Sequence, residues 1–195
     1  NTLREKGLDT EASGYVLMTL VNVYEKDLTV LPTHRVVFGL DGAKVRAFPE
    51  MLAKRFRIVP VSRESVAEAM AGKNIGMASC EGVFVLEKLP GTEPDVEGSA
   101  YTRALELTLL HKCILEDMLG IDKKVLAAHT NVIYTRSAEE ALGLVSSGKA
   151  QLAFLCNDIP VKAILDIASA GEKMPQKATY FYPKLLSGLV IRSLK

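Results

Sequence analysis

Residues 132–154 read Val132-Ile-Tyr-Thr-Arg-Ser-Ala-Glu-Glu-Ala-Leu-Gly-Leu-Val-Ser-Ser-Gly-Lys-Ala-Gln-Leu-Ala-Phe154. An apolar β-branched start leads to Ser137, which has Glu140 three residues later, and a second apolar run follows Gly148. A serine and a glutamate at this spacing form a capping box that starts a helix, and a glycine commonly ends one. The stretch therefore predicts a strand over 132–134, a helix over 137–148 and a strand over 151–155, which places the chain in the α/β class.

The same order of signals occurs a second time, over residues 58–79. A short strand leads to a helix that Ser62 can cap, then to Gly72-Lys73 and another strand, in parallel with Gly148-Lys149 in the first stretch. Duplication of a strand–helix–strand unit is one explanation. The common physics of helix capping and βαβ geometry is the other, and it explains the pattern equally well.

The remaining secondary structure follows from the same kinds of signal. Clustered β-branched and apolar residues predict strands over 15–23, 35–38, 57–61, 75–78, 83–89, 180–182 and 189–191. Helical spacing predicts helices over 45–56, 62–71, 100–119 and 161–170. Pro49 is expected in the first turn of its helix, where a missing N–H costs least. We expect a mixed β-sheet with packed helices, which could be organised as two βαβ-containing lobes.

The clearest loop runs from Pro90 to Gly98, because it holds two prolines, two glycines and three acidic residues. It predicts a boundary between a first α/β lobe at 15–95 and a second lobe at 96–195, with one structural unit as the alternative. Residues 1–14 are expected to be the remnant of an upstream helix or a linker.

Composition narrows the classes of partner. The 195 residues are 48% hydrophobic and carry a net charge of +1, so no overall field attracts nucleic acid or a membrane. A basic cluster (Lys44, Arg46, Lys54, Arg55 and Arg57) is expected to be a solvated helix face. No apolar run reaches the ~20 residues of a membrane helix. The three cysteines are scattered and form no CxxC pair, so we expect no metal site. Their small number and their spacing lead us to expect a protein of the reducing cytoplasm.

The first candidate site is Pro32-Thr33-His34-Arg35, between two expected strands. His34 is the candidate catalytic residue, for proton transfer, and Arg35 could clamp an anion with two hydrogen bonds. The alternative is an ordinary strand entry with a solvated arginine and a partly buried histidine.

The second candidate site is the C-terminal run from Met174 to Lys184, which sets three consecutive aromatic residues among lysines and prolines. In an extended strand, Lys177 and Thr179 point to one face and Tyr180, Tyr182 and Lys184 to the other. The expected ligand-binding residues are Arg35, Gln176, Lys177, Thr179, Tyr180, Tyr182 and Lys184. The alternative is a loop that buries its aromatic rings and exposes its lysines.

Three segments resemble a known family: Met174 to Lys184 with Ser187-Gly-Leu-Val190, Tyr15 to Asn22, and Val30 to Arg35. They are similar to the prokaryotic family catalogued as domain of unknown function 1015, and the chain resembles its C-terminal portion. Full members are longer and carry an Ala-Asp-Gly-His-His-Arg-type motif just upstream of the segment that matches Tyr15. That motif is absent here, so the N-terminal half is an expected partner.

The missing motif resembles the phosphate-cradling motif of ParB-like and sulfiredoxin-like proteins. The resemblance implies a nucleotide as cofactor and phosphoryl transfer to a small metabolite, such as free serine, for the full-length protein. For this chain it implies binding of an anionic or phosphorylated small ligand. The alternative is a non-catalytic regulatory or protein-interaction domain that docks through its aromatic segment.

Overall fold

The structure is a computed structural model that describes residues 5–7, 15, 18–23, 28–71, 74–128, 130–175, 177–184 and 188. Residues Val30–Tyr180 form one compact unit, and the described residues outside this range belong to a second. The strands are β1 (Thr29–Leu31), β2 (His34–Val37), β3 (Phe56–Val61), β4 (Ile75–Ser79), β5 (Gly82–Lys88), β6 (Val132–Thr135), β7 (Leu152–Leu155) and β8 (Tyr180–Tyr182). The helices are α2 (Gly42–Ala53), α3 (Val66–Ala69), α4 (Ala100–Ala104), α5 (Glu106–Leu109), η2 (Leu110–Met118), α6 (Lys123–Ala128), α7 (Ala138–Ser146) and α8 (Val161–Ser169).

A six-stranded sheet with the order β3-β5-β4-β7-β2-β6 organises the larger unit. All five neighbouring strand pairs in it are antiparallel. With helices on the sheet, the predicted α/β class is confirmed. The sheet takes strands from both sides of the Pro90–Gly98 loop, and the compact unit runs across that loop.

The two strand–helix–strand stretches seen in the sequence adopt the same arrangement. β3 and β4 are parallel to each other with β5 between them, and α3 connects them. In the same way β6 and β7 flank β2, and α7 connects them. Each unit is thus a split βαβ. The two units join where β4 pairs with β7. Read inward from either edge, the sheet therefore shows the first strand of a unit, the inserted strand and then the second strand of that unit.

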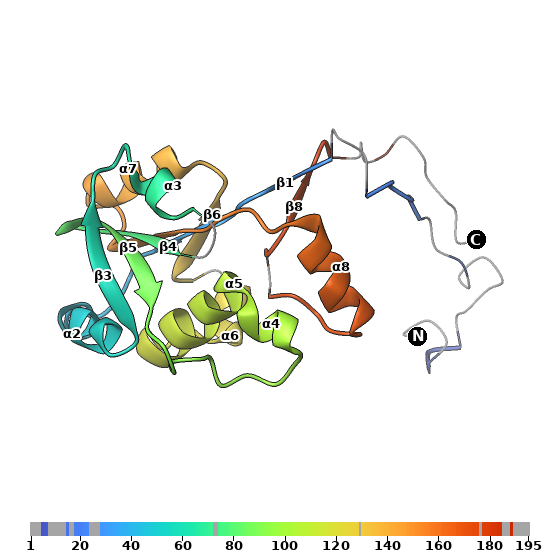
Figure 1. Cartoon of the computed structure of the whole chain (residues 1–195), viewed down its shortest axis with the longest axis horizontal. Helices are drawn as coiled ribbons and strands as arrows, with labels where there is room; N and C mark the ends of the chain where they lie inside the picture. The colour runs from blue at the N-terminus through green and yellow to red at the C-terminus, as the bar shows by residue number, and fades with distance from the viewer. Residues whose placement is uncertain are drawn as a thin grey trace. The chain divides into compact units, whose positions relative to one another are not determined.

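Two apolar clusters cover the two faces of the sheet, as expected for alternating side chains. One face carries Val36, Ala78 and Leu155 and packs on residues of α3 and α7. The other carries Val37, Met77 and Phe154 and packs on α2, α5, η2 and α6. Figure 1 shows α3 and α7 on one side of the sheet, with α2, α5 and α6 on the other.

The helix cap predicted at Ser137 is present, but one of its two hydrogen bonds is replaced by a pair of hydrogen bonds through Thr135. The Ser137 hydroxyl accepts from Glu140 N at 3.1 Å, as a capping box requires. The glutamate does not reach back to Ser137 N itself. Instead Ser137 N donates to the Thr135 hydroxyl, which in turn donates to the Glu140 carboxylate. Thr135 therefore extends the cap to two residues before Ser137 and joins the end of β6 to α7.

The expected helix over 45–56 begins earlier, at Gly42. Its N-cap is Asp41, whose carboxylate accepts from Ala43 N at 2.6 Å, so the first turn forms before the residues that suggested the helix. Pro49 consequently lies inside the helix. The prediction that Pro49 occupies the first turn is wrong, because the capping aspartate was not recognised.

The single helix expected over 100–119 is divided. Leu105 has an extended backbone (ψ 126°) that ends α4 and begins α5. Beyond α5 the chain is the π-helical η2, and Leu119 N donates to Ile114 O five residues back. π-Helical turns are rare and are frequent at functional sites. In the part of the chain that is described, no helix is long and apolar enough to span a bilayer.

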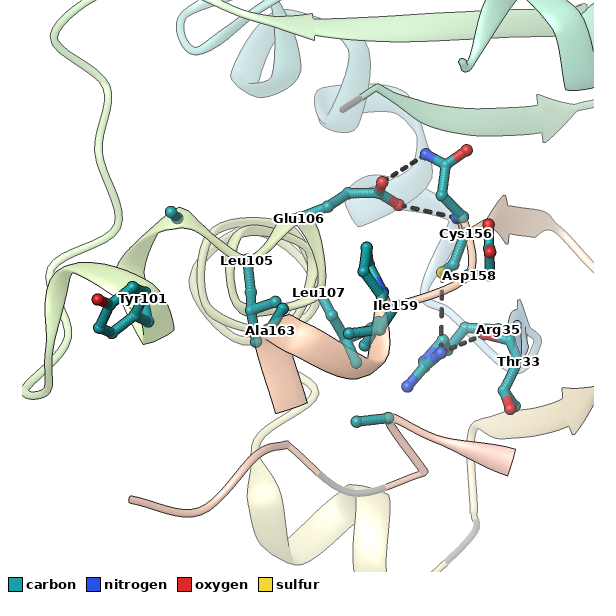
Figure 2. Close-up of a pocket in the computed structure, with 14 residues that line it drawn as sticks. Thr33, Arg35, Tyr101, Leu105, Glu106, Leu107, Cys156, Asp158, Ile159 and Ala163 are labelled. Atoms are coloured by element: carbon teal, nitrogen blue, oxygen red, sulfur yellow. Dashed lines mark hydrogen bonds between the residues drawn. The ribbon is translucent and has the colours of Figure 1, made fainter. Parts of the chain in front are cut away.

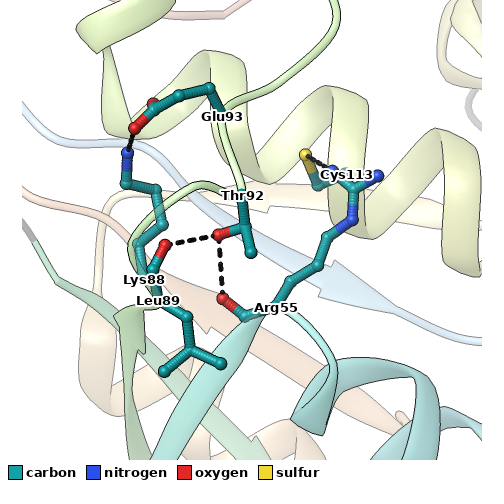
Figure 3. Close-up of polar contacts among 6 residues, drawn as sticks. All are labelled: Arg55, Lys88, Leu89, Thr92, Glu93 and Cys113. Atoms are coloured by element: carbon teal, nitrogen blue, oxygen red, sulfur yellow. Dashed lines mark hydrogen bonds and ion pairs between the residues drawn. The ribbon is translucent and has the colours of Figure 1, made fainter.

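The Pro90–Gly98 loop is tied to the sheet where it begins. The Thr92 hydroxyl hydrogen-bonds to Arg55 O and Leu89 O, and Lys88 forms an ion pair with Glu93 (Figure 3). Arg55 in turn donates to Cys113 Sγ on η2 at 3.0 Å. These contacts fix the path by which the chain passes from β5 toward α4.

The strand predicted over 15–23 is not formed by residues 18–23, which have no regular secondary structure. The apolar sequence predicts a strand covered on both faces, whereas residues 18–22 are exposed. Residue 15 is likewise non-regular, and the strand predicted over 189–191 lies outside the described residues. The prediction for residues 1–14 also falls mainly outside them.

Thr108, on α5, offers a direct test of packing. Its hydroxyl oxygen is buried and has no hydrogen-bond partner among the described residues. Thr108→Val keeps the shape and removes the unsatisfied polar atom, so we expect the free energy of unfolding to rise by about 1 kcal/mol. Urea unfolding measures the change, and Thr108→Ser, which keeps the hydroxyl, is the control. A Val variant less stable than the wild type would contradict the description of this site.

Candidate functional site

A cavity of about 310 Å³ lies within the larger unit. Its walls come from the residues around the start of β2, the α4–α5 junction, the segment between β7 and α8, and the first turn of α8. The polar lining residues are Thr33, Arg35, Tyr101, Glu106, Cys156, Asn157 and Asp158. Leu105, Leu107, Ile159 and Ala163 supply apolar lining (Figure 2).

Arg35 is the most buried charged residue of this lining, with only 1% of its surface exposed. It lies on β2, the strand that β6 and β7 enclose, and is paired in register with Phe154. Its Nη1 donates to Thr33 O and lies 3.7 Å from Cys156 Sγ, and its Nη2 donates to Lys177 O at 3.1 Å. The guanidinium is therefore held in one position by backbone carbonyls on both sides.

The charge of Arg35 influences the groups around it. It lowers the pKa of His34 and of His111, in both cases second to burial, and it opposes the rise that burial causes in the pKa of Cys156. The Cys156 thiol nevertheless reaches a pKa of about 11, because its burial dominates. Cys156 is thus a neutral wall of the cavity and not a nucleophile at neutral pH.

Glu106, the first residue of α5, brings a carboxylate to the same cavity. Asn157 holds it: its Nδ2 donates to Glu106 Oε2 at 2.6 Å, and its backbone N lies 3.4 Å from Oε1. Asn157 Nδ2 also donates to Asn74 O at 3.0 Å, so the contact is anchored beside β4. Burial raises the pKa of Glu106, while the two Asn157 hydrogen bonds and the charge of Arg35 counteract the rise.

The N-terminus of α8 also faces this cavity through Ile159, Pro160 and Ala163. No side chain caps the helix at Pro160. The start of a helix carries a partial positive charge and backbone N–H groups that attract anions. Together with Arg35, it contributes positive charge to the cavity lining.

His34 is buried but does not line the cavity. Because neighbouring side chains on a strand point to opposite faces, it faces the α3–α7 side of the sheet while Arg35 faces the other. Its Nδ1 accepts a hydrogen bond from Cys156 N at 3.1 Å, and burial lowers its pKa to about 4. The imidazole is therefore neutral near pH 7 and joins β2 to the end of β7.

The C-terminal candidates are distributed differently. Lys177 contacts Arg35 through its backbone carbonyl and its side chain is exposed, whereas neither it nor Thr179 is part of the cavity lining. The ring of Tyr180 lies 4.2 Å from the Arg136 guanidinium in a cation–π contact. Tyr182 and Lys184 are exposed and belong to the second unit, and Gln176 lies outside the described residues.

Sequence reasoning missed Glu106, Asn157 and Cys156. A charged residue within the apolar stretch Leu105-Glu-Leu-Thr-Leu-Leu110 was the one available signal. Asn157 carries no such signal, because its role depends on β7 ending beside α5. In the described ranges no group of three or more His, Cys, Asp or Glu residues is arranged to hold a metal ion.

The fold and the cavity define an α/β protein in which a buried arginine of the antiparallel sheet lines a cavity of about 310 Å³. The chain belongs to the family of proteins of unknown function DUF1015, whose model matches residues 1–113. This range includes two of the segments that suggested the family, 15–22 and 30–35, and the C-terminal run lies beyond it. A search among curated proteins found no match.

Solved structures show where the same fold occurs. The chain is similar to a conserved hypothetical protein from Pyrococcus furiosus, with a TM-score of 0.51 and 14% identity over 84% of this chain and 60% of that one. It is also similar to a free serine kinase in complex with AMP, with a TM-score of 0.51 and 15% identity over 84% of this chain and 57% of that one. A variant of such a kinase in complex with ADP gives a TM-score of 0.51 and 14% identity over the same shares. The chain thus spans 57–60% of the length of these structures, and the likeness shows the fold.

Proposed function

We propose that the unit Val30–Tyr180 binds a small anionic or phosphorylated ligand in the Arg35 cavity. The observation that carries the proposal is a guanidinium that is almost completely buried yet forms part of a cavity wall. A guanidinium that is held rigidly in a partly desolvated wall can form strong, charge-assisted hydrogen bonds to a carboxylate or a phosphate. The uncapped start of α8 adds positive potential at the same place.

Within a longer protein, we propose that this cavity serves a phosphotransferase that acts on a small metabolite, with a nucleotide bound by the upstream part of the protein. Similarity of fold to a free serine kinase that binds AMP and ADP supports this activity. The activity would need groups beyond those described, because the lining holds no second buried cation besides Arg35 and no metal-binding cluster among the described residues. His34 is not a residue of this cavity and would act through the position of β2.

Ligand-dependent thermal stability tests the binding proposal. Inorganic phosphate, ADP and phosphoserine are added separately at millimolar concentration, and the unfolding temperature is recorded. A ligand with micromolar affinity should add about 4 kcal/mol by mass action. Arg35→Met should abolish the increase, and Arg35→Lys, which keeps the charge but loses the planar fork, should retain part of it.

Lys177→Ala is the matched control for these variants. It removes a nearby positive charge but leaves the carbonyl that accepts from Arg35, so the ligand-dependent increase should persist. Each variant is compared with its own ligand-free baseline, because Arg35→Met also leaves Thr33 O without its donor. An increase that survives in Arg35→Met, or no increase with any of the anions, would contradict the proposal.

A further inference from the structure

A second cavity, of about 640 Å³, lies in the larger unit and shares no lining residue with the Arg35 cavity. Its lining comes from the Pro90–Gly98 loop, from α4, α5, η2 and α6, and from the segment that follows α8. It is therefore a separate candidate site, which the function proposed at Arg35 does not use.

Two buried polar atoms of residues in this lining have no hydrogen-bond partner among the described residues: the Thr108 hydroxyl oxygen and His111 Nε2. Only 5% of the Thr108 surface is exposed, and His111 lies on the π-helical η2, a backbone form that is frequent at functional sites. Residues three positions apart on a helix are neighbours. Because buried polar groups are normally satisfied, two neighbouring atoms without a partner point to a molecule in the cavity as the partner of both.

The remaining polar lining is rich in hydrogen-bond acceptors. Asp95 and Glu97, on the Pro90–Gly98 loop, are exposed, and Glu116 lies on η2. Lys112 Nζ is already engaged with Glu116 at 2.6 Å and with Asp117 at 3.1 Å. With three carboxylates against two ammonium groups, the lining disfavours an anion and offers acceptors to a ligand that donates hydrogen bonds.

Cations also donate hydrogen bonds, but the environment of His111 opposes a cation beside it. Burial lowers the pKa of His111 to about 3, and the charge of Arg35 contributes second. The imidazole is therefore neutral near pH 7, and a cation next to it would meet the same positive field. Hydroxyl groups avoid this conflict, because they donate and accept without carrying charge and suit either tautomer of a neutral imidazole.

Apolar residues complete the lining. Ile121 and Leu126 are buried and Met174 is partly buried, and surfaces of this kind accommodate the C–H groups of a carbon frame. The Thr108 hydroxyl can turn within this surface, since threonine in a helix divides between two rotamers. A ligand that carries several hydroxyl groups on a short carbon frame thus matches both kinds of wall.

We propose that this cavity binds a neutral polyhydroxylated molecule, a sugar or an open-chain polyol, whose hydroxyl groups hydrogen-bond to Thr108 and His111 and, nearer to solvent, to the carboxylates of the Pro90–Gly98 loop. The site adds a second ligand class to the anion proposed at Arg35 and does not depend on it.

An NMR titration of the isotope-labelled chain tests the proposal. Melting temperatures would be ambiguous, because polyols at high concentration stabilise proteins by exclusion from their surface. D-Glucose, myo-inositol, D-glucitol and glycerol are added separately at millimolar concentration, and at least one should give saturable shifts of the backbone amides of α5 and η2. A preference for the two cyclic compounds or for the two open-chain compounds identifies which kind of polyhydroxylated molecule fits.

Thr108→Val should weaken the best polyol about three- to tenfold, because one neutral hydrogen bond is lost. The same variant is expected to be more stable without ligand, so its weaker binding cannot be attributed to unfolding. Thr108→Ser keeps the hydroxyl and should keep the affinity within about twofold. His111→Phe keeps a ring without the nitrogens and should weaken binding by a similar factor, with circular dichroism to verify its fold.

The possible results separate this site from the one at Arg35. Equal affinities of the wild type and Thr108→Val would refute the hydrogen bonds proposed here. Tighter binding of putrescine or phosphate than of every polyol, at the same amides, would refute the neutral ligand. Absence of saturable shifts with all four polyols would assign the two polar atoms to water alone and overturn the proposal, while Arg35-dependent stabilisation by phosphate would still support the anion site.

Discussion

Replacing His34 by Asn is expected to remove a large part of the loss of stability that this protein undergoes in mild acid. The buried imidazole has a pKa of about 4, against 6.5 for an ordinary histidine. Its Nδ1 accepts a hydrogen bond from Cys156 N at 3.1 Å, so the folded protein needs this nitrogen unprotonated. Protonation would set a positive charge beside Arg35 and break the link between β2 and β7.

The sign follows from where the proton binds. Below pH 6.5 the unfolded chain takes up a proton that the folded chain refuses until about pH 4, so acid favours unfolding. The contribution is intact above pH 6.5 and is lost as the pH falls toward 4. At about 1.4 kcal/mol per pH unit, the full loss from this residue is about 3 kcal/mol.

Asn is the informative substitute because its Oδ1 can take the place of Nδ1 as acceptor from Cys156 N, and it does not titrate. Urea unfolding at pH 7 and near pH 4.5 gives the two free energies for each protein. The wild type should lose about 2 kcal/mol more than His34→Asn over this interval. His34→Ala, which removes the acceptor, should be less stable at both pH values. Equal losses in the wild type and in His34→Asn would show that His34 is not the acid-sensitive group.

The second large effect is expected at Gly76, on β4. A Cβ atom added there would lie 2.6 Å from Met70 Sδ and 2.9 Å from Leu155 Cβ. The methionine sulfur can move, but Leu155 Cβ is fixed to the backbone of β7, which pairs with Gly76 in register. Gly76→Ala should therefore destabilise the protein by about 1–3 kcal/mol, since a packed interior does not absorb an extra methyl group.

The same substitution at Gly143 is the matched control with the opposite sign. Gly143 lies within α7, and nothing is found within 4 Å of a Cβ built there. Gly143→Ala should stabilise the helix by about 1 kcal/mol, because alanine has the higher helix propensity. Urea midpoints measured with unchanged m-values test both variants. Similar effects of the two substitutions would contradict the close approach of α3 and β7 at Gly76.

The elements were predictable from sequence where local rules decide them. Ser137 and Gly148 marked both ends of α7. The repeated strand–helix–strand pattern predicted two βαβ units, but not the third strand that lies between the two parallel strands of each. Rules based on local sequence failed where contacts with other parts of the chain determine the backbone conformation. The π-helical course of η2 and the extended Leu105 divide a stretch whose apolar spacing indicated one helix.

The candidate site was predictable only in part, for a related reason. Arg35 was found because an arginine beside a histidine at a strand start is conspicuous. Its role needed β7, which is far away in sequence, to bring Cys156 beside it. Glu106 becomes a site residue only through Asn157. The exposed side chain of Lys177, in a turn before β8, agrees with the alternative interpretation of the C-terminal run as a loop that exposes its lysines. Long-range pairing, and not residue type, selects these members.

The inner position of β2 has a consequence for synthesis on the ribosome. β3, α3, β4 and β5 follow one another closely and can pair as they emerge, whereas both partners of β2 are translated much later. At about 5–20 residues per second, the apolar Val36-Val37 pair waits on the order of ten seconds for β6 and β7. During most of its elongation the nascent chain thus carries an apolar strand whose partner strands have not yet been synthesised. In this interval a chaperone could bind the strand, or it could pair wrongly with a chain on a neighbouring ribosome.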